Sequence, residues 1–298
     1  MSMRNFFCAA AAVLLAISAW GQSTDYSRRY NALVERVGRS GVGVETLLEN
    51  WAKAEPENPD MLQARFHYYI TKSQQTEVVQ RTEPKYLGLS PILALKDSTG
   101  RDVYYYELLK YDDILFAEAL KVADKAISVY PARLDFRFMK ANAYLSYERE
   151  SPDMALSYIM GLVHDFINSK PAWKYYGTDT PEPYPVDDEL FCDLMQEYCY
   201  SLYLLGTPSS YDAFYRLSKR LNECFPKNSN FIANIGSYYL VVSRDYKTAL
   251  KYYDKVLKIE PDNVSVIHNA LLAAKRLKNA KLEKKYNNML AKYQSSGR

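Results

Sequence analysis

The sequence predicts an all-α fold in which antiparallel helix pairs stack into a superhelix, with one small β-hairpin inserted. One spacing occurs three times. Three apolar or small residues lie at positions i, i+4 and i+7, and a proline follows five positions after the third. Each copy is followed by a new stretch with the apolar period of a helix. The chain has only 11 Gly against 28 Tyr, which favours long helices with aromatic packing over a turn-rich β protein. The three copies begin at Leu47, Ala119 and Ala249.

The first 21 residues have the pattern of a signal peptide. Arg4 supplies a positive charge, residues 6–18 are apolar, and Ala19 and Gly21 offer small side chains before a cleavage at Gln22. The apolar run is short for a bilayer span, although an uncleaved anchor stays a second interpretation. We therefore expect an exported protein, periplasmic or secreted, whose residues 22–298 form one helical repeat domain.

The clearest repeat covers residues 229–263. Ile232, Ile235, Gly236 and Tyr239 share one face of a first helix, and a second amphipathic helix follows from Tyr246 until Pro261 ends it. Small residues at Gly236 and Ala249 allow the two helix axes to approach closely. This unit resembles the tetratricopeptide repeat (TPR) family, whose helix-turn-helix repeat carries small residues at the crossing and a closing proline. The resemblance implies a solenoid of five to six helix pairs that binds proteins or peptides in a concave groove.

Two stretches interrupt the expected array. Within residues 76–106, the apolar runs 92–95 and 103–106 flank a polar turn, which predicts a β-hairpin that projects from the helices. Residues 168–186 contain four prolines and are expected to form a loop. The polar amphipathic segment 277–293 suits a helix that caps the last repeat.

Three cysteines follow the signal segment, in a chain expected to reach an oxidising compartment. In an antiparallel helix hairpin centred on residues 206–208, Cys192 lies opposite Cys224, so a disulfide between them is geometrically possible. The alternative is that Cys192, Cys199 and Cys224 are small buried apolar residues.

The first helix of each repeat is expected to line the groove. In the clearest repeat this gives Asn234, Ser237 and Tyr238, and in the next repeat His268, Asn269 and Arg276. Asn234 and Asn269 occupy equivalent positions. The resemblance to peptide-binding TPR proteins implies that such asparagines bind a ligand backbone, because an amide both donates and accepts hydrogen bonds. The alternative is that they satisfy neighbouring helix groups.

Charges are distributed unevenly although the net charge is only +3. Residues 175–215 contain eight acids and no Lys or Arg, whereas residues 275–298 contain eight basic residues and one acid. This pattern has two interpretations: a solvated surface, or a bipolar surface that orients a charged partner. The near-balanced total excludes a general nucleic-acid role.

The chain shows no catalytic or metal-binding motif. His67, His164 and His268 are far apart, and there is no His-x-x-x-His or Cys-x-x-Cys spacing. We therefore expect no enzyme activity, cofactor or metal, and a protein or peptide as the partner. The first hypothesis is a groove-binding scaffold of the cell envelope. The second is a structural or assembly subunit of an envelope complex that uses its outer face and insertions, and the third is an envelope hydrolase.

Overall fold

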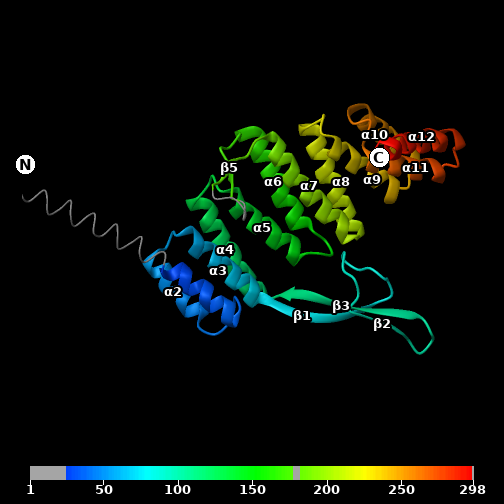
Figure 1. Cartoon of the computed structure of the whole chain (residues 1–298). Helices are drawn as coiled ribbons and strands as arrows, with labels where there is room; N and C mark the ends of the chain where they lie inside the picture. Colours follow the sequence, from blue (N-terminus) through cyan, green and yellow to red (C-terminus); the bar gives the residue numbers. More distant parts are fainter. Residues whose placement is uncertain (1–24, 177–181, 297–298) are drawn as a thin grey trace, which may run out of the picture. The chain divides into compact units, whose positions relative to one another are not determined.

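The computed structural model describes residues 25–176 and 182–296. The expected signal peptide at 1–21 and residues 177–181 of the proline-rich loop lie outside this range. The described residues contain 12 helices and a small antiparallel hairpin sheet (Figure 1). The chain divides into two compact units, unit 1 and unit 2. The predicted all-α fold with a small β-hairpin inserted is confirmed.

The described residues of unit 1 are 25–79, 107–143, 173–176 and 182–184. Its helices are residues 25–37, α2 (Val44–Ala54), α3 (Pro59–Ser73) and α4 (Asp113–Val129), and α5 (Leu134–Tyr147) begins in it. Trp51 is the centre of the core, 1% exposed, and its ring stacks on Tyr26 with 6.0 Å between centroids. The Asn58 side chain accepts hydrogen bonds from two amides of α3, and Pro59 follows at the first helical position, so the helix start is fixed locally.

The described residues of unit 2 are 80–106, 144–172 and 185–296. After the end of α5, each helix packs on the next from α7 to α12, and α6 packs on α8. Side-chain caps at the starts of α7 to α11 satisfy amides that a helix leaves without intrahelical partners. The helices are α6 (Asp153–Ser169), α7 (Asp188–Leu205), α8 (Pro208–Cys224), α9 (Ser229–Val241), α10 (Tyr246–Ile259), α11 (Val264–Arg276) and α12 (Ala280–Ser296).

The pair α9–α10 has the narrow crossing that the sequence predicts. Ala249 is 0% exposed, and a Cβ atom at Gly236 would lie 2.7 Å from the Tyr253 ring. The two helices therefore approach to a distance that no larger side chain permits. Ile232, Leu250 and Val256 fill the surrounding core together with residues of α11.

The insertion lies between α3 and α4, which pack on each other as one helix pair. Its base is closed by a hydrogen bond from the Asp112 amide to the Ser73 carbonyl (2.8 Å). The strands are β1 (Gln74–Arg81), β2 (Leu93–Lys96) and β3 (Asp102–Tyr111), in the order β1-β3-β2. The predicted β2–β3 hairpin is confirmed, with Leu95 opposite Val103. The third strand, β1, was not expected, because its sequence QQTEVVQR alternates only weakly between apolar and polar.

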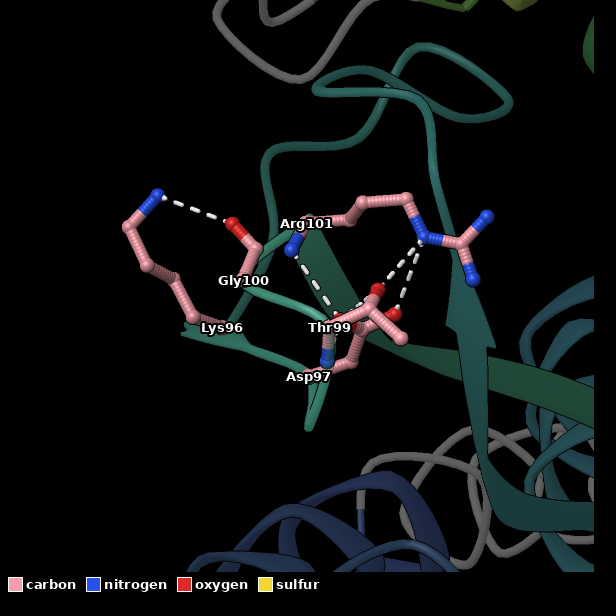
Figure 2. Close-up of polar contacts among 5 residues, drawn as sticks. All are labelled: Lys96, Asp97, Thr99, Gly100 and Arg101. Carbon is pink, nitrogen blue, oxygen red and sulfur yellow. Dashed lines mark hydrogen bonds and ion pairs between the residues drawn. The ribbon is translucent and has the colours of Figure 1, made fainter.

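The hairpin turn is held by side chains of its own residues (Figure 2). Asp97 accepts hydrogen bonds from the Thr99 amide (2.8 Å), the Thr99 hydroxyl (2.6 Å) and the Arg101 amide (3.0 Å). Gly100 has φ +82°, a conformation that favours glycine. The predicted loop after α6 contains the two-residue strands β4 (Lys174–Tyr175) and β5 (Tyr184–Pro185), which pair with each other.

Candidate functional site

In unit 2, α7, α9 and α11 form a continuous surface, the α7–α9–α11 face. Helix α9 contacts both α7 and α11. The face consists of side chains at helical spacing that the core does not use. They are Glu189, Asp193, Glu197, Tyr200 and Leu204 from α7, Asn234, Ser237, Tyr238 and Val241 from α9, and His268, Asn269, Leu272 and Arg276 from α11.

Asn234 is committed to neighbouring helix groups. Its Nδ2 atom donates to Gln196 Oε1 of α7 (2.8 Å), and Gln196 Nε2 donates back to Asn234 Oδ1 (3.3 Å). The donor and the acceptor atom of the Asn234 side chain therefore both have a partner within the protein, and this residue ties α9 to α7. Its expected contact with a ligand stays a prediction.

The other expected residues of α9 also have neighbours. The Tyr253 hydroxyl lies 3.4 Å from Ser237 Oγ and donates to it. Tyr238 stacks on Tyr215 of α8, with 4.4 Å between ring centroids. A hydrogen bond with the Tyr239 hydroxyl, followed by burial, raises the pKa of Tyr215 to about 12. The Tyr215 phenol is therefore neutral at ordinary pH, and it supports Tyr238 as part of an uncharged aromatic surface.

The three expected residues of α11 are more open. His268 and Arg276 are exposed and Asn269 is half-buried. The structure thus places the six predicted residues on two neighbouring helices of one face. It adds Gln196, which lies 38 positions before Asn234, close to the spacing of 35 between Asn234 and Asn269. An alignment of first helices by this period could have found it.

Within the described residues, Cys192, Cys199 and Cys224 are free thiols. Cys192 and Cys199 are buried, and Ser218 Oγ lies 3.5 Å from Cys199 Sγ as donor. Burial raises the pKa of Cys192 and of Cys199 to about 12, so both stay protonated and unreactive at neutral pH. The Cys192–Cys224 disulfide stays a prediction for oxidising conditions.

The charges on the face have opposite signs at its two sides. Glu189, Asp193 and Glu197 lie four residues apart on α7, and all are exposed. At the end of α11 and just after it, Lys275, Arg276 and Lys278 are exposed as well. None of these six residues forms an ion pair with a described residue. The sequence-level charge asymmetry is therefore present on this surface.

Each unit also has a cleft that the sequence did not predict. In unit 1, a polar cleft of about 400 Å³ is lined by Tyr30, Asn31, Arg39, Asp60 and His67, among others. Burial and then the Arg39 charge lower the pKa of His67 to about 4, so it is neutral at physiological pH. In unit 2, a cleft of about 450 Å³ separates residues 83–88 from the turn between α7 and α8.

Neither a metal cluster nor a membrane-spanning helix occurs in residues 25–176 and 182–296. This part of the chain has no group of three or more His, Cys, Asp or Glu side chains that could hold a metal ion. Within the same residues, no helix combines the length and apolarity needed to cross a bilayer.

Comparison with known proteins yields distant structural similarity only. No family model matches the chain, and no curated protein matches it. Among solved structures, it is similar to PilF of Pseudomonas aeruginosa (TM-score 0.37, 15% identity, covering 59% of this chain and 68% of that one). It is also similar to MamA (0.35, 14%, 60% and 83%) and to a MamA RS-1 double mutant (0.30, 11%, 92% and 97%). Likeness at this level carries no information on function.

Proposed function

We propose that the protein is a non-catalytic scaffold of the cell envelope that holds another protein, or a segment of one, on the α7–α9–α11 face. The observation that carries the proposal is the exposure of large apolar side chains on every helix of this face. Tyr200 is 54% exposed, Leu204 48%, Val241 42% and Leu272 43%. Exposed apolar groups bordered by charges are typical of surfaces that bind proteins.

The chemistry around these side chains supports the same function. Removing aromatic and aliphatic groups from water favours binding when a partner covers them. The side-chain amides of Gln196 and Asn269 can fix the orientation of that partner through hydrogen bonds. The reciprocal Gln196–Asn234 pair fixes two helices of the face before a partner arrives, so little ordering is needed on binding.

Site-specific photo-crosslinking in the native host tests this proposal. A photoreactive residue is placed at Tyr200 or at Leu272, with Lys247 on α10 as the matched exposed control outside the face. We expect one discrete protein partner from the two face positions and none from the control. The partner is then titrated against the purified protein, where Tyr200→Ala with Leu272→Ala should weaken binding at least about tenfold. Equal crosslinking from Lys247, or unchanged affinity, would falsify the proposal.

A second candidate function is that of an assembly subunit which associates through the sheet. The observation in its favour is the apolar edge strand β2, where Leu93 is 49% and Leu95 48% exposed, with Ile92 just before it 59% exposed. Edge strands with exposed apolar side chains favour pairing with another chain. If Leu93→Ser with Leu95→Ser releases the protein from its complex while the face variant does not, this second function holds instead of the first.

A further inference from the structure

We infer that the α7–α9–α11 face is complementary to itself, and that two copies of this chain pair through it about a two-fold axis. One side of the face carries the acidic patch, Glu189, Asp193 and Glu197 on α7. At the other side lies the basic patch, formed by Arg276 of the face and by its exposed neighbours Lys275 and Lys278. The surface between them belongs to α9 and has no charged side chain in the set that forms the face.

Geometry makes such a surface self-complementary. A two-fold axis in the plane of the face, at right angles to the line that joins the patches, brings each patch over the opposite patch of the second copy. An isologous contact of this kind forms every interaction twice. The pair therefore closes on itself and does not grow further.

The charges that orient this contact have no ion-pair partner among the described residues. Ion pairs join described residues elsewhere in the chain, yet the six charges of the two patches take part in none with a described residue. Pairing would place each acid near a base and would also cover exposed apolar groups, including Tyr200 and Leu272. Apolar burial strengthens the contact, and the charges select its orientation.

As a consequence, a second copy of the chain and the proposed protein partner compete for the same face. A second copy covers the same face that the proposed protein partner would use, so dimerisation would keep the face closed until the partner displaces it. The test of the dimer uses the purified protein alone. Its failure would therefore leave the proposed function standing, and failure of the crosslinking experiment would leave the dimer standing.

The experiment is sedimentation equilibrium of the purified chain over a range of concentrations and salt. At about 0.01 M ionic strength the Debye length is roughly 30 Å and at about 1 M it is roughly 3 Å, so an electrostatically oriented dimer should dissociate as salt rises. We expect a monomer–dimer equilibrium at low salt. A monomer at every concentration and salt overturns the inference, and so do larger open assemblies, which indicate a head-to-tail contact instead.

Charge-reversal variants locate the contact. The acid-reversed variant carries Asp193→Lys and Glu197→Lys, and the base-reversed variant carries Lys275→Glu and Arg276→Glu. Each alone should dimerise at least about tenfold more weakly than the native chain, because like charges then face each other. Their equimolar mixture should recover the dimer, since acids again face bases at both patches.

A matched control reverses Lys247 and Lys258, two exposed lysines of α10 outside the face, and should dimerise like the native chain. Circular dichroism confirms that every variant is folded. If reversed variants fail to fold, the salt dependence of the native chain still decides the inference. Dimerisation that is unchanged in both reversed variants, or a mixture that stays monomeric, overturns it.

Discussion

The α9–α10 helix pair and the sheet insertion are both defined parts of the structure, but different forces hold them. In α9–α10, buried apolar side chains interlock around Gly236 and Ala249, both shielded from water. The insertion has few buried side chains, and β2 is exposed along its whole length. Its order depends on hydrogen bonds at particular backbone positions. Packing therefore stabilises the first region, whereas backbone conformation and polar contacts, with a few buried side chains such as Leu87, stabilise the second.

The segment 82–92 shows how the insertion is anchored within unit 2, and we call it the strap. The Tyr106 hydroxyl donates to the Glu83 carbonyl (2.6 Å), Arg149 donates to the Leu87 carbonyl (2.7 Å), and the Tyr86 hydroxyl donates to Glu150. Leu87 is buried although its φ is +50°. A side chain at Gly88 would lie 2.7 Å from the Leu204 carbonyl oxygen, so only glycine fits there.

The largest expected effect on the stability of the α9–α10 pair comes from Ala249→Trp. The indole has no space at the closest approach of α9 and α10, so we expect a loss of about 3 kcal/mol or more in the free energy of unfolding, with cooperative loss of helicity. Urea denaturation followed by circular dichroism measures it. Ala291→Trp, at an exposed position of α12, is the matched control and should change stability by less than about 0.5 kcal/mol. A native-like midpoint for Ala249→Trp would show that packing does not set this crossing.

A smaller and local effect is expected for Leu87→Ala in the strap. Removing a buried leucine side chain costs about 2–3 kcal/mol, and this loss should weaken the attachment of the strap. Hydrogen exchange should become faster in residues 82–92 while the amides of α9 and α10 keep their protection. Leu95→Ala, on an exposed side chain of β2, is the control and should leave both unchanged. Equal loss of protection in α9–α10 would mean that the two regions share one core.

Sequence patterns predict the first region better than the second, and the reason is physical. Helical period and the need for small residues at Gly236 and Ala249 are properties of residue type and spacing, so they are readable along the chain. The turn at Asp97 is likewise local. By contrast, β1 pairs with a strand some thirty residues later, and its polar sequence acquires partners only in the folded protein. The strap contacts follow from long-range geometry in the same way.

The candidate site likewise has features that local sequence predicts and features that depend on long-range contacts. That Asn234 lies on a first helix could be predicted from the repeat, but its bond to Gln196 could not, because it depends on how neighbouring repeats dock. The clefts at His67 and at the strap combine residues from separate elements, and no local motif marks them.

A third prediction concerns this inter-repeat bond. Asn234→Ala removes the reciprocal amide pair and leaves Gln196 half-buried without that partner, so we expect a loss of about 1 kcal/mol in unfolding free energy. Asn269→Ala, at the equivalent position of α11, should cost less, since no hydrogen bond joins its side chain to a described residue. Equal losses in urea denaturation would contradict the structural role of Asn234. They would favour a shared role of both asparagines in helix packing.

The smallest effect is expected at the hairpin turn, where the stabilising contacts join residues close together in the sequence. Hydrogen bonds from the Thr99 hydroxyl, and then from the Arg101 amide, hold the pKa of Asp97 below its ordinary value. A carboxyl whose folded pKa is lowered stabilises the turn above its ordinary pKa, and this contribution is lost as pH falls through the lowered value. Acidification should therefore quicken amide exchange of Thr99 and Arg101, relative to the change expected for exchange chemistry alone.

Asp97→Asn should abolish that acid dependence, because an amide does not titrate in this range. Asp102→Asn, which removes only the exposed ion pair with Lys96 (3.0 Å), is the matched control and should keep it. NMR titration of the Asp97 carboxyl gives the direction of its pKa shift independently. A pKa at or above the ordinary value would mean that the Thr99 and Arg101 contacts do not favour the charged form. The turn would then be ordered by Gly100 and its backbone hydrogen bonds, and not by the charge of Asp97.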